Sequence, residues 1–461
     1  MKYRIEEDAL GKVRIPSESY HGAETQRALD LFGISGIRVP ADFIRSYVMI
    51  KRSAAMANFK AGKLDARRSR AIVKACDMLL RGRFMDQFPL DVFQAGAGTN
   101  TNMNVNEVIA NIAIGILGGR KGDYDIVHPN DHVNMSQSTN DTYPSAINVS
   151  AYLAVTRKLA PQLAALRKSL SAKGREFADV VKIGRTHLQD AVPITLGEEF
   201  GAYAREVERA LHLLDSSSKE LLELSLGGTA VGTGINAGRE YQSHVIKDLD
   251  RITGVKFRVV RNKFAMTESR IDVMAVDDSL RETALVLIKI ANDLRLLASG
   301  PRAGMHEILL PETMPGSSIM PGKVNPSVPE MLTMVCFEVI GLNAGITEAA
   351  ENGQLELNVF MPLISYNTIF SIDILANALG VFRKSCINGI RADRASISKH
   401  LDENLSLATA LNQYIGYEKA AKIARRALKE NKTIKEVCLE MKILDRKTLD
   451  KILGPRREAG R

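Results

Sequence analysis

The chain has 461 residues, of which 45% are hydrophobic and 25% charged, and its formal net charge is +9. A chain of this length exceeds what a single hydrophobic core usually holds, so two or three domains are expected. The lysines and arginines are interleaved with acids, and no basic stripe with aromatic side chains occurs. This pattern argues against nucleic acid as a partner.

Neither the first residues nor the cysteines indicate an exported protein. The first ten residues, MKYRIEEDAL, contain no apolar stretch of the kind found in a secretory signal. No run of about 18 apolar residues occurs, so we expect no membrane-spanning helix. The four cysteines are far apart and form no CxxC pair, which argues against a zinc site or a redox motif. We therefore expect a cytoplasmic protein with reduced thiols.

The expected secondary structure changes twice along the chain. Before about residue 140 the elements are short, and the sequence is rich in Gly and Asn. From residue 140 to residue 390, apolar residues recur at three- and four-residue spacing, which is typical of amphipathic helices. Shorter helices follow residue 391. We accordingly place three domains at residues 1–139, 140–392 and 393–461.

The predicted helices of the middle region have similar lengths. They cover residues 146–177, 196–224 and 273–298, a segment that follows Pro329, and a segment from Pro362 to about Phe382. In the last region, residues 404–428 and 434–441 are the expected helices. Several long helices of matching length predict an all-α fold with a central long helix bundle. The stretch Ala284–Ala291 is apolar on more than one helical face, which favours a homo-oligomer with a shared helical core.

Four polar segments interrupt the helices, at residues 96–104, 128–141, 184–190 and 316–326. Their hydroxyl and amide groups, together with a lysine and an arginine, suit the capture of carboxylates. Several precede a long helix, where free backbone N–H groups and the helix dipole favour an anion. For a single segment such as Ser138-Thr139-Asn140, a helix cap is the more common explanation. Four such segments together favour an anion-binding site.

The segment 316–326 is the most informative of the four. Gly316 and Gly322 permit a tight, mobile loop, Ser317 follows a glycine, and Lys323 adds a positive charge. No G-x-S-x-G elbow is present, so hydrolase chemistry is not indicated. We expect no cofactor, because the glycine-rich stretch 226–234 follows a helix rather than a strand. We expect no metal, because Pro129 separates His128 from His132 and prevents a regular helical ligand pair.

The sequence of residues 316–326, GSSIMPGKVNP, resembles the signature of the aspartase/fumarase superfamily. Residues 96–111, 128–141, 184–197 and 299–311 also resemble the corresponding family blocks, in the same order. The resemblance covers the chain from Gly22 to about Leu453. It implies an all-α fold in three domains, in which the central bundles of four subunits form a multi-helix core. It also implies that each active site takes its blocks from three subunits of this homotetramer.

Within this superfamily, the chain looks most like aspartate ammonia-lyase, which deaminates L-aspartate to fumarate and ammonia. The motif QSTND at 137–141 and the run NPSVPE at 325–330 resemble the aspartase forms. The motif GAETQR at 22–27 and the segment 409–421 are closer to class II fumarate hydratase, which is the alternative. Two other functions are disfavoured. An inactive scaffold would lack some of the polar residues, and all of them are present. A superfamily lyase for larger succinyl substrates is disfavoured by the aspartase-like blocks.

The resemblance also implies roles for individual residues around a small dicarboxylate. Ser317 would be the base, and His187 would orient the substrate with Glu330 as its partner. Asn140 would contact the leaving amine, and Arg27 would assist at a carboxylate. The remaining substrate-binding residues would be Thr99, Ser138, Thr139, Thr186, Ser318, Lys323 and Asn325. Such donors must hold the doubly negative aci-carboxylate that forms when the neighbouring carbon loses a proton. A serine can act as a base only if the loop closes and expels water.

Overall fold

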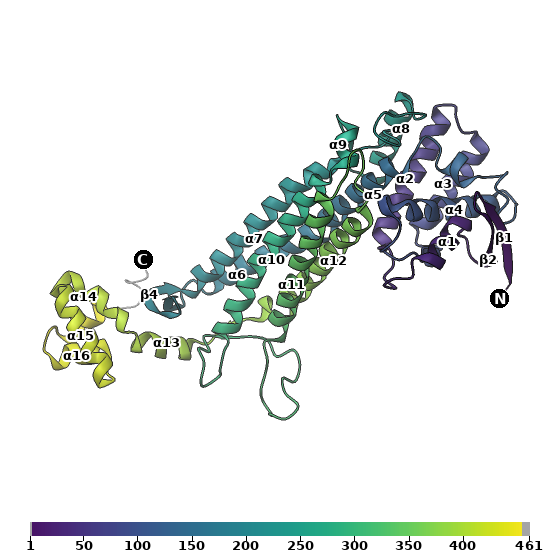
Figure 1. Cartoon of the computed structure of the whole chain (residues 1–461). Helices are drawn as coiled ribbons and strands as arrows, with labels where there is room; N and C mark the ends of the chain where they lie inside the picture. The colour runs from purple at the N-terminus through teal and green to yellow at the C-terminus, as the bar shows by residue number, and fades with distance from the viewer. Residues whose placement is uncertain (1, 454–461) are drawn as a thin grey trace. The chain divides into compact units, whose positions relative to one another are not determined.

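The computed structural model describes residues 2–453, and helices make up 64% of it. Within this range the strands form only four two-stranded sheets. The predicted all-α fold with long central helices is confirmed (Figure 1). The chain divides into two compact units: unit 1 comprises Met1–Pro161, His212–Ala284 and Phe337–Ala376, and unit 2 comprises Gln162–Leu211, Leu285–Cys336 and Asn377–Arg461. The three-domain division at residues 139 and 392 stays a prediction.

Unit 1 begins with an antiparallel hairpin, in which β1 (Tyr3–Asp8) pairs with β2 (Gly11–Pro16). Four helices follow: α1 (Ala23–Leu31), α2 (Ala41–Lys60), α3 (Ala66–Leu80) and α4 (Thr99–Ile116). An aromatic cluster joins α2 to a later helix, because the rings of Phe43 and Tyr143 lie 4.8 Å apart. Edge-to-face and tilted ring contacts of this kind add to the stabilisation that burial provides.

The rest of unit 1 includes α5 (Thr139–Ala154), α8 (Arg239–Thr253) and α9 (Lys263–Glu268), with a parallel pair of short strands, β5 (Glu223–Leu224) and β6 (Arg258–Val259). The helix predicted at 146–177 is α5 continued by one π-helical turn (Val155–Leu159) and by α6 (Ala160–Glu176). The π-helical turn ends just before Pro161. Because proline has no N–H, it removes one i→i−4 hydrogen bond at this point.

The four longest helices match the predicted ones and lie side by side in Figure 1: α7 (Leu196–Ser218), α10 (Ile271–Leu297), α11 (Ser327–Glu351) and α12 (Met361–Ser385). Each contributes one part to unit 1 and another to unit 2. In unit 1, Thr368 of α12 donates a 2.7 Å hydrogen bond to Asp277 of α10. In unit 2, Tyr203 of α7 donates a 2.8 Å hydrogen bond to Asp293 of α10. The bundle therefore combines an apolar interior with buried polar links.

Two of these helices expose or bury their apolar residues to different degrees. By length and composition, Ser327–Glu351 and Met361–Gly389 are each able to cross a membrane, and their most apolar windows are 33% and 61% buried. Met334 and Phe337 of α11 are 63% and 59% exposed, and Leu285 of α10 is 52% exposed. Exposed apolar surface on this scale is typical of an interaction surface.

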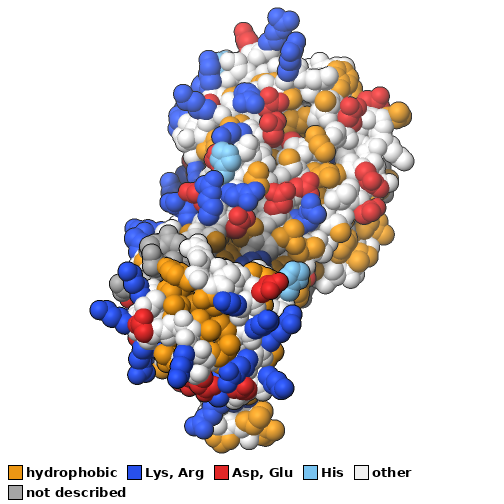
Figure 2. Space-filling model, turned by 90° about the vertical axis from the view of Figure 1, so that its left-hand side faces the viewer, with side chains coloured by type: hydrophobic (Ala, Val, Ile, Leu, Met, Phe, Trp, Pro, Cys, Tyr) orange, Lys and Arg blue, Asp and Glu red, His pale blue; other side chains and the backbone are white. Residues whose placement is uncertain are grey.

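The last part of unit 2 is a small helical cluster. It consists of α13 (Arg394–Glu403), α14 (Ala408–Ile415), α15 (Tyr417–Glu430), α16 (Ile434–Glu440) and α17 (Arg446–Ile452). The single helix expected over 404–428 was wrong, because Gly416, with φ 76° and ψ 155°, separates α14 from α15. Figure 2 shows hydrophobic side chains on the face of this cluster, bordered by Lys and Arg. Residues 454–461 of the predicted third domain lie outside the described residues.

Candidate functional site

Thr99 is the first residue of α4 and is exposed at the helix N-terminus. The residue before it, Gly98, has φ 81°, and a Cβ on it would lie 2.0 Å from the ring of Tyr143. Only glycine satisfies both conditions. The polar segment 96–104 therefore turns sharply into the helix. In the first turn of α4, the Thr101 N–H donates a 3.0 Å hydrogen bond to the Gln94 side chain.

Ser138, Thr139 and Asn140 lie at the N-terminus of α5. The Ser138 hydroxyl accepts a 3.2 Å hydrogen bond from the Asn140 N–H, and the Asp141 carboxylate accepts one of 2.9 Å from the Ser138 N–H. This reciprocal pair is a capping box, so the capping role weighed for the segment is present. Thr139 is buried, whereas Ser138 and Asn140 are half-buried. The cap thus fixes the position of three predicted substrate-binding residues.

Asp141 is an important residue that the sequence argument did not single out. Its carboxylate is fully buried and also accepts hydrogen bonds from the N–H groups of Gly227, at 2.9 Å, and Thr229, at 3.0 Å. Burial raises the pKa of Asp141 to about 6. The glycine-rich stretch 226–234 is therefore a loop that docks on α5. Its Ala230 carbonyl accepts a 2.7 Å hydrogen bond from the Asn140 side chain.

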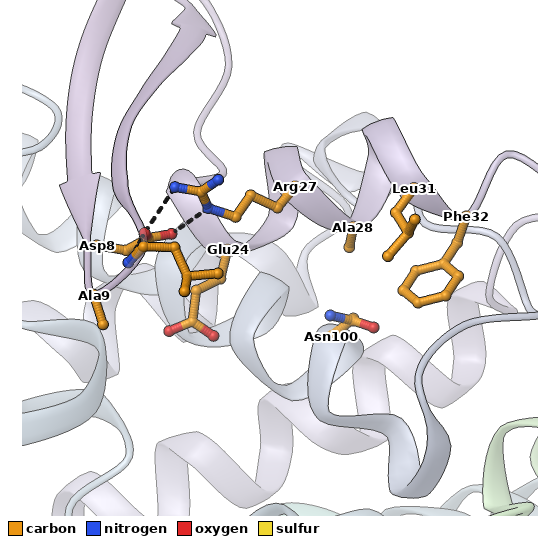
Figure 3. A pocket seen from close by; sticks show the side chains of 9 residues that line it. Asp8, Ala9, Glu24, Arg27, Ala28, Leu31, Phe32 and Asn100 are labelled. Carbon is orange, nitrogen blue, oxygen red and sulfur yellow. Dashed lines mark hydrogen bonds and ion pairs between the residues drawn. The ribbon is translucent and has the colours of Figure 1, made fainter.

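Arg27 lies on α1 beside a pocket of about 280 Å³ in unit 1 (Figure 3). Its guanidinium group binds both oxygens of Asp8, at 2.8 and 2.9 Å, and the Gly11 carbonyl at 3.0 Å. The hydrogen bond from Arg27 is the largest cause of the lowered pKa of Asp8. Glu24 and Asn100 also line the pocket. The predicted carboxylate ligand Arg27 thus already holds a carboxylate that belongs to the chain itself.

In unit 2, Thr186 and His187 lie at the tip of an antiparallel hairpin. Strand β3 (Val181–Thr186) pairs with β4 (Gln189–Thr195), and the turn between them is His187-Leu188, with φ values of 57° and 59°. Both Thr186 and His187 are exposed. The sequence argument found these residues but did not predict the hairpin that carries them.

The segment that holds Ser317 and Lys323 is an irregular loop around a hollow of about 490 Å³. The Ser317 hydroxyl accepts hydrogen bonds from the N–H groups of Ile319, at 3.3 Å, and Met320, at 3.0 Å. The Asn325 side chain donates to the Gly316 carbonyl and closes the base of the loop. Ser318 and Lys323 are exposed. N–H donors that point at Ser317 Oγ favour a negative charge on that oxygen.

Glu330 follows this loop, in the first turn of α11. Its carboxylate lies 3.8 Å from Arg295 of α10. Within the described residues of one chain, His187 and Glu330 form no ion pair with each other. The pairing implied by the resemblance therefore stays a prediction.

The predicted site residues fall into two groups. Unit 1 holds Arg27, Thr99, Ser138, Thr139 and Asn140, and unit 2 holds Thr186, His187, Ser317, Ser318, Lys323, Asn325 and Glu330. Within unit 1, one helix N-terminus brings three of them together. Within unit 2, one loop holds the proposed base beside a lysine. Each group supplies hydroxyl and amide donors of the kind that bind carboxylates.

Comparison with known proteins identifies the family. A family model described as "Lyase" matches residues 11–341, and one described as "Fumarase C C-terminus" matches residues 407–457. The chain belongs to the aspartase/fumarase superfamily. The chain is thus a member of a family of lyases, as the resemblance of its polar segments predicted.

Individual relatives of this superfamily lyase carry two names. The chain is 46% identical over 460 residues to "Fumarate hydratase class II" of Helicobacter pylori, and this match covers 100% of the chain and 99% of the relative. It is also 46% identical over 454 residues to "Aspartate ammonia-lyase" of the same species, covering 98% of this chain and 97% of the relative. A cobalt-bound fumarate lyase:delta crystallin from Brucella melitensis has a TM-score of 0.96 and 46% identity, and the match covers 99% of this chain and 100% of that one.

Proposed function

We propose that this lyase forms fumarate reversibly from a small dicarboxylate, and that L-malate is its substrate, as for a class II fumarate hydratase. The supporting observation is that most of the similar proteins compared are named class II fumarate hydratase, at 44–47% identity over nearly the whole chain. This favours the alternative over the aspartase prediction. L-Aspartate is the second candidate, because the QSTND motif and an equally identical aspartate ammonia-lyase favour it.

The chemistry would be an anti β-elimination. Ser317, as an alkoxide, would take a proton from the carbon beside one carboxylate, and the extra charge would pass to that carboxylate as an aci-form. Collapse of the aci-form would then form the C=C bond of fumarate and break the bond from the neighbouring carbon to the hydroxyl group, which would leave as water after it takes up a proton from solvent. Two N–H groups already point at Ser317 Oγ, which supports its role as the base. Lys323, in the same loop, would bind the growing negative charge. Removing one donor aimed at such a charge typically costs about 2.7–4 kcal/mol of transition-state stabilisation.

The other residues would bind and orient the substrate. Thr99, at the start of α4, and Ser138 with Thr139, at the start of α5, would bind the carboxylates, because helix N-termini favour anions. Thr186, Asn325 and Ser318 would supply further donors from unit 2. His187, with Glu330 as its partner, would orient the substrate, and Asn140 would contact the leaving group. Arg27 would assist at a carboxylate only after it releases Asp8.

We propose that the site is completed in a homotetramer, with each active site shared between subunits. The exposed apolar residues of α11, Met334 and Phe337, support a helical interface between copies. Residues that are exposed in one chain can contribute to the active site of a neighbouring subunit. Such exposed residues include Thr186, His187 and most of the loop that holds Ser317. A cytoplasmic location and the absence of any cofactor, metal, membrane or nucleic-acid partner belong to the same proposal.

A direct assay tests the substrate. Purified protein is given L-malate or L-aspartate, and fumarate is followed by its ultraviolet absorbance. The reverse reaction is run with fumarate alone and with fumarate plus ammonium. We expect turnover of L-malate, and consumption of fumarate without ammonium. Turnover of L-aspartate alone would establish the second candidate instead, and no fumarate from either substrate would refute the fumarate-forming function.

A further inference from the structure

A carboxylate that no part of the proposed mechanism uses lies fully buried in unit 2. Glu307 has 0% exposure, and its Oε2 lies 2.9 Å from Lys182 Nζ while its Oε1 lies 2.8 Å from Arg185 Nη1. Lys182 is 1% exposed and also contacts Glu199 of α7 at 2.8 Å. The Glu307 contacts are ion pairs without aligned N–H···O geometry. They therefore depend on charge.

Both cations belong to β3, the strand that ends at Thr186. Residues three apart on a regular strand point to opposite faces, so Lys182 and Arg185 could not both meet one carboxylate. The pairing of β3 with β4 shifts register between Ile183 and Arg185. Between these positions one residue of β3, Gly184, stands opposite two residues of β4, so the extra residue of this bulge belongs to β4 and the pairing is irregular at this point. At this irregular part of the hairpin, Lys182 and Arg185 both reach Glu307, and the carboxylate compensates their charges.

The backbone of Glu307 is fixed on both sides. Its N–H donates to the Leu297 carbonyl, at the end of α10, at 2.8 Å, and its carbonyl accepts from the Asp393 N–H at 2.9 Å. The next two residues form β7 (Ile308–Leu309), which pairs with β8 (Arg391–Ala392). Glu307 therefore connects the hairpin to the end of the long helix α10 and to the β7–β8 pair.

The far strand of the hairpin has its own attachment. The Ala191 carbonyl in β4 accepts hydrogen bonds from the Asn404 side chain, at 3.0 Å, and from the Ser406 hydroxyl, at 2.6 Å. The helix before these residues, α13, also approaches Glu307, because His400 Nδ1 lies 3.5 Å from Glu307 Oε1. The base of the hairpin is therefore held on both strands, whereas the end of the hairpin, residues 186–190, is exposed.

We propose that Glu307 is a positioning residue, which holds strand β3 through Lys182 and Arg185 so that Thr186 and His187 meet the substrate in one fixed geometry. This inference rests on the proposed role of Thr186 and His187 in substrate binding. Glu307 does not touch the substrate. Its effect passes through Arg185, the direct neighbour of Thr186.

A purely structural role predicts a different outcome from a positioning role. If Glu307 only stabilises the fold, its replacement lowers the melting temperature and leaves the kinetic constants of the folded protein unchanged. If it positions the hairpin, its replacement raises KM and loosens the hairpin. Misplacing a hydrogen bond to a charged substrate changes its binding by about tenfold or more. The two roles therefore differ in a quantity that is easily measured.

The experiment compares full-length variants by steady-state kinetics and by amide hydrogen exchange over residues 181–195. Glu307→Gln keeps the shape and removes the charge, and we expect a KM increase of about tenfold with faster exchange. Glu307→Asp keeps the charge and should recover part of the change. Asp293→Asn is the matched control, because this carboxylate of unit 2 contacts Tyr203 and Lys289 and not the hairpin. We expect its KM to stay at the wild-type value.

Arg185→Lys provides a second route if Glu307→Gln fails to fold, because it keeps the charge and loosens only the contact beside Thr186. We expect it to raise KM and to speed exchange at 185–189. Wild-type KM and wild-type exchange in the folded Glu307 and Arg185 variants would overturn the proposal. If the wild-type protein turns over neither L-malate nor L-aspartate, the proposed function fails. The exchange rates of the hairpin still test the positioning role in that case.

Discussion

Replacing Asp277 by asparagine should make the protein more stable, and more so at higher pH. Asp277 lies in α10, is 1% exposed, and accepts a 2.7 Å hydrogen bond from Thr368 of α12. Burial, with a contribution from the neighbouring Asp278, raises the pKa of Asp277 from its ordinary value of 3.8 to about 8. At neutral pH the folded chain therefore keeps this carboxyl mainly protonated.

The sign of the pH dependence follows from proton binding. Between about pH 4 and pH 8 the folded chain holds a proton at Asp277 that the unfolded chain has released, so the free energy of unfolding falls as the pH rises. One pKa unit corresponds to about 1.4 kcal/mol, so this group alone lowers the stability by an amount on the order of 5 kcal/mol at pH 8. Asp277→Asn removes the ionisable group and keeps an oxygen that accepts from Thr368.

The assay is urea unfolding followed by circular dichroism, for the wild type and Asp277→Asn, at about pH 5 and about pH 8. We expect the stability difference in favour of the variant to grow by several kcal/mol between these values. Asp215→Asn is the control, because Asp215 is an exposed acid that pairs with Lys219. The same pH dependence in the wild type and Asp277→Asn would refute the reasoning.

Three further predictions concern the proposed site and the thiols. Ser317→Ala should lower turnover by several orders of magnitude with an unchanged circular dichroism spectrum, and a wild-type rate would remove Ser317 as the base. Lys323→Ala should mainly raise KM in steady-state assays, since it removes a charge that binds substrate; an unaltered KM would contradict that role. All four cysteines are buried and unpaired, and burial raises the pKa of Cys336 and Cys386 to about 12. A thiol reagent should therefore label the native protein slowly, and labelling should become complete only after unfolding. Rapid labelling of the native protein would show that the thiols are accessible.

The long helices could be predicted because their periodicity is local information. Four of the five helices predicted for the middle region begin or end within a few residues of α7, α10, α11 or α12, and the fifth, at 146–177, ends near the end of α6. The helix at 404–428 was predicted as one because a single glycine inside an amphipathic pattern is often tolerated. Gly416 instead adopts a left-handed φ that ends the helix. The β3–β4 hairpin was missed because its turn is His187-Leu188, whereas two-residue hairpin turns are recognised by Asn-Gly or Asp-Gly.

The polar segments were found because each is compact in sequence, but their partners are not. Asp141 lies within the predicted polar segment 128–141, yet its contacts with Gly227 and Thr229 join residues more than 80 positions apart. The contact of Glu307 with β3 and the contact of Arg27 with Asp8 are also tertiary. No local pattern encodes which charge a buried acid will meet. The candidate site residues could therefore be proposed from a single sequence, but the residues that hold them in place could not.

The surroundings of Asn140 bear on the choice between malate and aspartate. Its side-chain N–H donates to the Ala230 carbonyl, so its oxygen is the atom left to accept from a leaving group. An ammonium and a hydroxyl both donate to such an oxygen, and they differ in charge. The adjacent acid, Asp141, is buried, and its oxygens accept three backbone N–H groups. Within the described part of unit 1, the acid next to Asn140 is thus committed to the backbone, so that of these two residues only Asn140 offers an acceptor to a leaving group.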